Sequence, residues 1–300
     1  MDCRKYQFWR AVRPFSFTVA LCACLTGIAA AWAAGFVDPA RAVLVVVGGV
    51  LLQAGVNLIN DYADLTQLRT HNGTGYLAMQ LIRRNFQAGL SCFALAAMLA
   101  LYLIALVGLP LLWLCLVGLA GALSYTLDPV NYKNRGLGVV LVFWLMGVLM
   151  VSGSYLVIAG SFSLTVVWQS VPISLLVSLL LLSNELRDYE ADQRDGIGTL
   201  SGRIGYRRAC QLYVVLLLAA YASVGLLWYY GLLVQCWPLL LTLPALISPL
   251  KLLGAEADAR SKLTPHTGRL LTLFGLIYCY CLVVAVPGVP SWTPLSLFSG

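Results

Sequence analysis

The sequence predicts an all-α, polytopic membrane protein with nine transmembrane helices around a central cavity and a cytoplasmic N-terminus. Of its 300 residues, 60% are apolar and only 10% are charged, which excludes an ordinary soluble domain. Apolar runs of about 18 residues or more recur along the chain, and such runs are typical of membrane-spanning helices. We therefore expect a single integral-membrane domain that covers residues 1–300.

The expected spans are long apolar stretches separated by short segments that hold nearly all of the charge. The first span follows a basic N-terminus and superficially resembles a signal peptide. Its apolar run is too long for a typical signal and further hydrophobic segments follow, so we expect an uncleaved helix. In chain order, the predicted transmembrane helices cover residues 15–36, 42–62, 86–108, 110–127, 137–160, 165–187, 208–230, 232–253 and 269–290.

The basic residues predict the orientation. Of the 19 Lys and Arg residues, all but Arg41 fall on one side of the membrane in this arrangement. Such a bias marks the cytoplasmic side, and we expect the membrane to be a bacterial inner (cytoplasmic) membrane. The net charge of +7 then reflects this topology and contact with anionic headgroups, so the lipid bilayer is an expected partner and nucleic acid is not.

Cysteine and histidine give no sign of a zinc site. The nine cysteines include no Cys-x-x-Cys pair and mostly lie inside apolar runs. They predict small residues that pack between helices rather than a disulfide framework. The two histidines, His71 and His266, are too few and too isolated for a metal cluster.

An acidic segment follows the sixth predicted helix. Residues 185–195 contain five of the 12 acidic side chains of the chain, directly after a nearly uncharged apolar run. Asn184, Asp188 and Asp192 are four residues apart, so on a helix they share one face. Two carboxylates at the end of a membrane helix are costly unless a positive group meets them. The natural candidate is a hard divalent cation, which binds carboxylate oxygens and completes its shell with water and phosphate.

A weaker copy of this pattern ends the second predicted helix. Both copies contain Asn-x-x-x-Asp-Tyr, and residues 57–64 read NLINDYAD. Asp61 and Asp64 are three residues apart and can share a helix face. A single acid at such a helix end is usually just solvated, but two matching copies on the same side of the membrane predict a common function.

A third polar segment covers residues 125–138. Within it, a loop bounded by Pro129 and Gly136 supplies Lys133 and Arg135. Taken alone, these two residues are ordinary positive-inside anchors. Beside two pairs of carboxylates, they suit a diphosphate, whose negative charge needs both metal ions and basic side chains. Because the apolar helices can hold a lipid tail, a lipid diphosphate fits both parts of the predicted site.

These segments resemble those of the UbiA-type membrane prenyltransferases, most closely the branch that acts on 1,4-dihydroxy-2-naphthoate in menaquinone synthesis. The shared motifs are Arg13-Pro14 and the segments 57–64, 125–138 and 184–205, in the same order and on the same side of the membrane. The resemblance covers most of the chain. It implies Mg²⁺-dependent transfer of a polyprenyl group from its diphosphate to an aromatic, quinone-precursor acceptor, with release of diphosphate.

Carried over by position, the resemblance also implies roles for individual residues. The catalytic, metal-binding carboxylates are Asp61 and Asp64 for one Mg²⁺ and Asp188 and Asp192 for the other, while Lys133 and Arg135 contact the diphosphate and Asn57, Asn60 and Asn184 orient the same site. Nearby aromatic faces would stabilise an allylic cation, and an apolar cavity would exclude the water that hydrolyses it.

Departures from the family pattern bear on the acceptor. Leu68 and Val139 stand where the family often has acids, and Ile197-Gly198 replaces a pair that usually includes Lys. Because both Asp pairs remain, we still expect catalysis. Three alternatives stay open: a divergent prenyltransferase with another acceptor, a non-catalytic transporter or binding protein, and a catalytically inactive family member that serves as an assembly partner.

Overall fold

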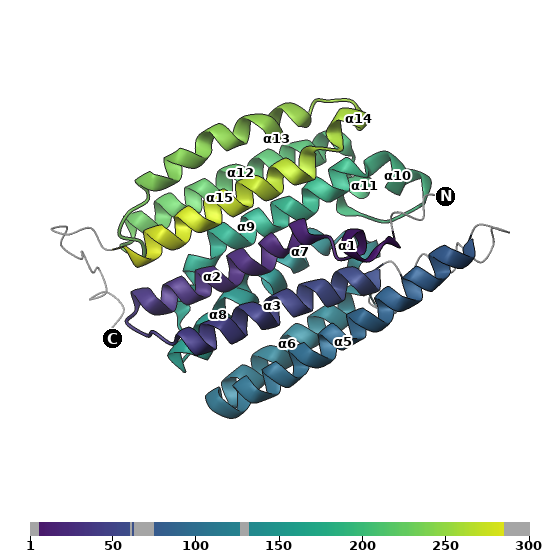
Figure 1. Cartoon of the computed structure of the whole chain (residues 1–300). Helices are drawn as coiled ribbons and strands as arrows, with labels where there is room; N and C mark the ends of the chain where they lie inside the picture. The colour runs from purple at the N-terminus through teal and green to yellow at the C-terminus, as the bar shows by residue number, and fades with distance from the viewer. Residues whose placement is uncertain (1–5, 61, 63–74, 127–131, 285–300) are drawn as a thin grey trace.

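Long apolar helices run side by side through the molecule and carry most of its residues (Figure 1). The computed structural model describes residues 6–60, 62, 75–126 and 132–284. Over those ranges the chain forms helices and turns but no strand. The predicted all-α class is therefore confirmed.

The long helices alternate with short helical segments that gather at one end of the bundle (Figure 1). The long or central elements are α2 (Phe17–Ala33), α3 (Pro39–Asn60), α5 (Gly75–Val107), α6 (Leu109–Thr126), α7 (Gly138–Val142), the π-helix η5 (Phe143–Leu149), α8 (Met150–Ala159), α9 (Leu164–Arg187), α12 (Tyr206–Tyr229), the 3₁₀ helix η6 (Trp237–Leu246), α13 (Ile247–Leu252) and α15 (Leu263–Val283). The short ones are α1 (Phe8–Ala11), η2 (Pro14–Ser16), η4 (Tyr132–Arg135), α10 (Tyr189–Arg194), α11 (Leu200–Ile204) and α14 (Ala257–Arg260).

In the part of the chain that the structure describes, seven helices are long and apolar enough to cross a membrane. Each overlaps one of the predicted spans, while the fourth and eighth predicted spans correspond to the shorter apolar helices Leu109–Ala122 and Trp237–Leu252. In α5 only 11% of the most apolar window is buried within the protein, so its outward faces suit contact with lipid. An integral membrane fold is thus confirmed, whereas the count of nine, the central cavity and the orientation stay predictions.

One helix starts much earlier than the sequence predicts. α5 begins at Gly75 rather than at residue 86, because its first turns are amphipathic and bury Ala78 and Ile82 against Tyr6. Asn85 Nδ2 donates to the Tyr6 carbonyl oxygen at 2.9 Å. The extension therefore holds the N-terminal segment.

Local sequence signals set the helix ends on the side of the bundle away from the short helical segments. Arg41 N donates to Asp38 Oδ1 at 2.9 Å, so Asp38 caps the start of α3, and Pro39 follows it in the first helical turn. Gly160 stops α8 in the left-handed conformation, with φ of 74°. Asp38, which lies outside both acidic motifs, thus has a structural task of its own.

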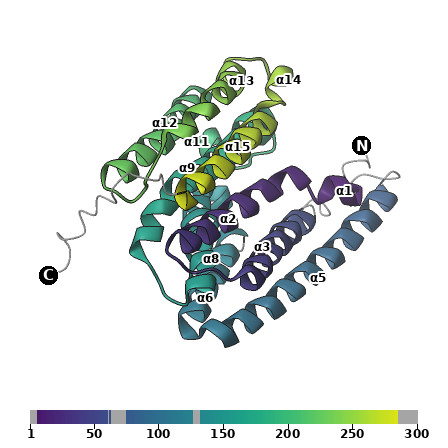
Figure 2. The ribbon, with the colours of Figure 1, turned by 60° about the vertical axis from the view of Figure 1, so that its left-hand side comes forward.

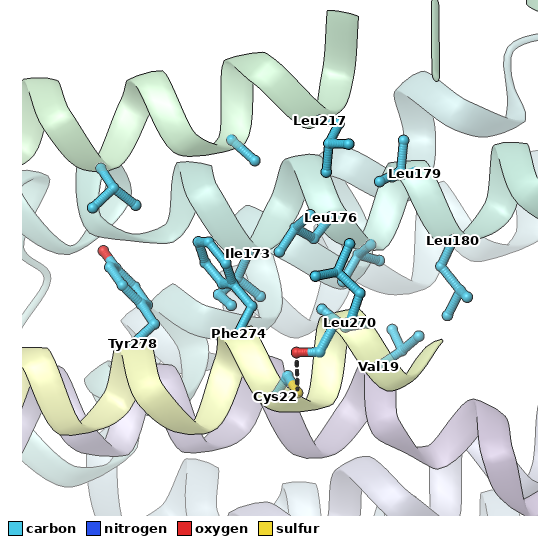
Figure 3. Close-up of a cluster of buried hydrophobic side chains, with 14 of the residues drawn as sticks. Val19, Cys22, Ile173, Leu176, Leu179, Leu180, Leu217, Leu270, Phe274 and Tyr278 are labelled. Atoms are coloured by element: carbon cyan, nitrogen blue, oxygen red, sulfur yellow. Dashed lines mark hydrogen bonds between the residues drawn. The ribbon is translucent and has the colours of Figure 1, made fainter. Parts of the chain in front are cut away.

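The core is organised around α9. This helix packs against α2, α12 and α15, with which it contributes to one continuous cluster of buried apolar side chains (Figures 1, 2 and 3). Members of this cluster include Val19, Cys22, Ile173, Leu176, Leu179, Leu180, Leu217, Leu270, Phe274 and Tyr278. Packing along its length fixes α9, so the position of its final turn is set by the whole bundle.

The described cysteines behave as small packing residues. All eight that the structure describes are free thiols. Cys22 Sγ donates to the Leu271 carbonyl oxygen at 3.5 Å (Figure 3), and a Cβ on Gly275 would lie 3.1 Å from the Cys22 Cβ. The prediction that these residues fill gaps between helices is confirmed for this part of the chain.

Gly27 marks a tight contact between α2 and α8 and yields a test of the packing. A Cβ at this position would clash with the Val151 carbonyl oxygen and lie 2.6 Å from Ser154 Cβ, both on α8. We expect Gly27→Ala to destabilise the protein by about 1–3 kcal/mol, because α2 and α8 would have to separate. Gly48→Ala is the control, since a Cβ at Gly48 meets nothing within 4 Å. A thermal midpoint in detergent that fell equally in both variants would contradict the proposed close approach.

Candidate functional site

The acidic segment continues the hydrogen-bond ladder of α9 beyond its end. The Asp188 amide donates to the Asn184 carbonyl oxygen at 3.0 Å, and the Asp192 amide donates to the Asp188 carbonyl oxygen at 2.9 Å. Asp188 thus ends α9 and begins α10. The three residues follow one another at intervals of one helical turn, so the predicted common face of Asp188 and Asp192 is consistent with the backbone.

Asp188 is held by the residue before it. Arg187 Nε donates to Asp188 Oδ1 at 2.8 Å, and Arg187 Nη2 donates to Asp188 Oδ2 at 2.6 Å. The two side chains are 29% and 45% exposed, so the pair stabilises the fold by no more than about 1 kcal/mol. The carboxylate therefore stays accessible to a cation that could take over from the guanidinium.

The segment after α10 folds back onto the last turn of α9. Gly196, with φ of 66°, allows the turn in which the Ile197 amide donates to the Asp192 carbonyl oxygen at 2.9 Å. The buried Glu185 then accepts from the Ser201 amide at 2.9 Å through Oε2. Sequence analysis gave Glu185 no role, although an acid inside an apolar helix is a signal that it has a fixed partner.

A second ion pair fixes α10 from the side of α14. Arg260 Nη2 donates to Glu190 Oε2, and the Arg260 guanidinium lies over the Tyr206 ring, 4.6 Å from its centroid. The hydrogen bond from Arg260 holds the pKa of Glu190 below its usual value, because it favours the ionised carboxylate. Sequence analysis missed both residues as a pair, since 70 residues separate them.

The basic loop lies against the same folded-back segment. Gly136, which follows η4, has φ of 75°, and a Cβ there would be 2.7 Å from Arg203 Cδ and 3.4 Å from Leu200 Cα. Only glycine allows this approach. Arg135, the residue before it, is exposed, and the side chain of Lys133 lies outside the described residues. The basic loop thus meets, at α11, the segment that follows the acidic residues.

The first Asn-containing segment is placed at the same end of the bundle, where α3 ends near α1 (Figure 1). Asn57 is buried, and its Nδ2 donates to the Val12 carbonyl oxygen at 2.7 Å and to Ser16 Oγ at 2.6 Å. Asn60 is exposed at the last position of α3. Asp61 and Asp64 lie outside the described residues, so their predicted roles stay predictions.

The donor set fits a hard, partly hydrated cation. Among the described residues no group of three or more His, Cys, Asp or Glu side chains could hold a metal ion. Asp188 and Asp192 therefore offer two carboxylates, both partly accessible. Mg²⁺ is usually bound by one or two carboxylates and fills its other positions with water and substrate phosphates. The arrangement suits Mg²⁺ delivered together with a phosphate-containing substrate, and not a closed protein cage.

Comparison with known proteins decides the family. Residues 20–266 match the UbiA prenyltransferase family. The chain is a member of this family, and hence a prenyltransferase. The UbiA prenyltransferase domain-containing protein 1 of Rattus norvegicus is 30% identical to it over 300 residues, or 95% of this chain and 85% of the rat protein. The 1,4-dihydroxy-2-naphthoate octaprenyltransferase of Escherichia coli (strain K12) is 30% identical over 271 residues, or 84% of this chain and 86% of that enzyme.

Solved structures of UbiA homologues share the fold. The apo structure of a UbiA homologue from Aeropyrum pernix K1 matches with a TM-score of 0.62 and 20% identity, covering 92% of this chain and 98% of that chain. A UbiA homologue from Archaeoglobus fulgidus bound to GPP and Mg²⁺ matches with a TM-score of 0.59 and 17% identity, covering 92% and 99%. The UbiA fold therefore extends over nearly the whole chain.

Thr199 provides a test of how the folded-back segment is held. As the N-cap of α11, its Oγ1 accepts from the Gly202 amide at 3.3 Å. We expect Thr199→Ala to destabilise α11 by about 1 kcal/mol, because the amide loses its acceptor. Hydrogen exchange of residues 199–205 should become about fivefold faster in Thr199→Ala, which is what that free energy corresponds to. Thr199→Ser keeps the hydroxyl and should exchange like the parent protein; equal acceleration in both variants would refute the cap.

Proposed function

We propose that the protein catalyses the Mg²⁺-dependent transfer of a polyprenyl group from a polyprenyl diphosphate to an aromatic acceptor, with release of diphosphate. The observation that carries this proposal is that the basic loop packs against α11, the helix that follows the acidic segment. Arg203 belongs to the segment that follows Asp188 and Asp192, and Gly136 of the basic loop packs directly on it. A diphosphate with its Mg²⁺ needs both kinds of group side by side.

The carboxylates and the basic loop divide the charge of the substrate between them. Asp188 and Asp192 would hold one Mg²⁺, and Asp61 and Asp64 would hold a second at the end of α3. Mg²⁺ held by these carboxylates would stabilise the negative charge that develops on the diphosphate as the allylic C–O bond breaks. Lys133 and Arg135, the two basic residues of the loop before α7, would supply positive charge to the remaining phosphate oxygens.

The asparagines shape the site and the apolar helices close it. The side-chain amide of Asn57 holds the segment around Val12 and Ser16 against α3. In this way Asn57 would fix the end of α3 that precedes Asp61. Asn60 and Asn184, at the ends of α3 and α9, stand nearer to the carboxylates in sequence. The surrounding helices would hold the prenyl chain and exclude water, which would otherwise capture the allylic cation. The new C–C bond forms when the electron-rich ring attacks that cation and then loses a proton.

We infer that the acceptor is a quinone precursor, with 1,4-dihydroxy-2-naphthoate as the first candidate. The similarity to the Escherichia coli and Bacillus subtilis enzymes named for this substrate supports it. Val139, which stands where an acid is usual in that branch, is buried, and its carbonyl oxygen accepts from Ser178 Oγ at 3.0 Å. Because an apolar side chain suits this buried position, the departure there is absorbed by helix packing and leaves the acidic segment intact.

The site would face the cytoplasm. α2 begins at the end of the bundle that carries α10 and α11, and α15 finishes at the opposite end (Figure 1). An odd number of membrane crossings gives this arrangement. Together with the bias of Lys and Arg toward one side of the predicted spans, it supports a cytoplasmic N-terminus in one transmembrane domain, which we expect to lie in a bacterial inner membrane.

An assay with the purified chain tests the proposal. It contains a labelled polyprenyl diphosphate, Mg²⁺ and a panel of aromatic acceptors that includes 1,4-dihydroxy-2-naphthoate. We expect a prenylated product, equimolar release of diphosphate, and loss of both when EDTA removes the metal. Diphosphate release without any prenylated product would point to a different reaction. Binding of the diphosphate without turnover on any acceptor would instead favour an inactive or transporting relative.

Matched substitutions separate the site from the rest of the protein. We expect Asp188→Asn to lower kcat/KM by about 100-fold or more, because one metal ligand loses its charge while its shape is kept. Asp38→Asn makes the same chemical change at the opposite end of the bundle and preserves a good helix cap, so it should leave kcat/KM unchanged. Equal losses of kcat/KM in the two variants would refute the assignment of Asp188.

A further inference from the structure

The acidic segment contains a carboxylate that points away from the two predicted metal ligands. In an α-helix each residue turns the direction of its side chain by about 100°. Glu190 is two residues before Asp192 on α10, so it lies about 200° around the helix from Asp192, while Asp188 is the N-cap one turn before Asp192. Glu190 therefore occupies the back of α10.

The back of α10 is held by one buried group. Arg260 pairs with Glu190 and packs on Tyr206, and its side chain is only 4% exposed. Tyr206 is itself fixed, because its hydroxyl donates to the Leu253 carbonyl oxygen at 2.7 Å, and its ring contacts Tyr189 with centroids 5.4 Å apart. The start of α12, the segment before α14 and the first residue of α10 thus meet around a single guanidinium.

This arrangement is a poor way to gain stability. Burying a guanidinium costs free energy that a half-exposed partner recovers only in part, and Arg260 Nε has no hydrogen-bond partner among the described residues. An apolar residue at position 260 would fill the space without that cost. What Arg260 supplies, and an apolar residue cannot, is a directional bond to one carboxylate of α10.

We propose that Arg260 is a positioning residue for prenyl transfer, which acts through Glu190. By gripping the back of α10 it fixes the rotation of this short helix, and so the direction in which Asp188 and Asp192 present their carboxylates. Six residues are too few to set that direction by their own backbone bonds. The inference rests on the proposed function, in which these two aspartates bind Mg²⁺.

Metal binding by the purified full chain tests this directly. The probe is Mn²⁺ in place of Mg²⁺, with free Mn²⁺ measured by electron paramagnetic resonance in the presence of a non-hydrolysable prenyl diphosphate analogue. We expect Glu190→Gln and Arg260→Gln each to weaken Mn²⁺ binding by about 10-fold, the lower end of the usual range for groups that orient metal ligands. The Mg²⁺ concentration that half-saturates turnover should rise by the same factor, with kcat at saturating Mg²⁺ nearly unchanged.

The double variant and two controls decide between outcomes. If Arg260 acts through Glu190, the double variant binds Mn²⁺ no more weakly than the worse single variant; additive losses would overturn the coupling. Arg208→Gln and Asp258→Asn remove exposed charges from neighbouring segments and should leave Mn²⁺ binding unchanged. Glu190 is 52% exposed, so Glu190→Gln decides alone should Arg260→Gln fail to fold. Normal Mn²⁺ binding by a folded Glu190→Gln overturns this inference only, whereas absence of Mn²⁺ binding by the parent protein overturns the proposed function as well.

Discussion

The structure depends on the cost of placing an ionised group in hydrocarbon. Because that cost keeps charge away from the middle of membrane helices, the acids and bases that a diphosphate needs can lie only where helices end. Helices α3 and α9 end on the same side of the bundle, and the basic loop before α7 turns on that side too (Figure 1). The proposed charged site would therefore be assembled from segments far apart in the sequence, and the apolar bundle would supply both its support and the wall for a prenyl tail.

Support passes from the core to the site through α9. Its apolar side chains pack between α2, α12 and α15 (Figure 3). Because such an interior is close-packed, the position of the last turn of α9 is fixed. After α9 the chain continues in the short helices α10 and α11, which are not part of this apolar cluster along their whole length. Two hydrogen bonds take over, from the Ser201 amide to Glu185 and from the Gly202 amide to Thr199. Close packing of Gly136 against Arg203 and Leu200 then brings the basic loop onto the same segment.

The sequence predicts those features that follow from hydrophobicity and spacing. Apolar runs predicted the positions of the long helices. The four-residue spacing predicted a common face for Asp188 and Asp192, with which the backbone hydrogen bond between them is consistent. The early start of α5 escaped because its first turns bury only one stripe, which a search for fully apolar runs overlooks. The Glu190–Arg260 pair escaped for another reason: a contact across 70 residues depends on how helices pack, and no local pattern reports it.

Helical geometry then divides an acidic stretch that looks uniform in the sequence. Glu185, Asp188, Glu190 and Asp192 all lie within two turns, and composition alone would make each a candidate metal ligand. Glu185 is buried and consumed by a backbone amide, and Glu190 faces backward onto a buried guanidinium. Asp188 and Asp192 are partly accessible and follow each other at an interval of one helical turn. Four carboxylates in this stretch are more than one Mg²⁺ needs. In the proposed site, Glu185 and Glu190 hold the segment in place, and Asp188 and Asp192 bind the metal.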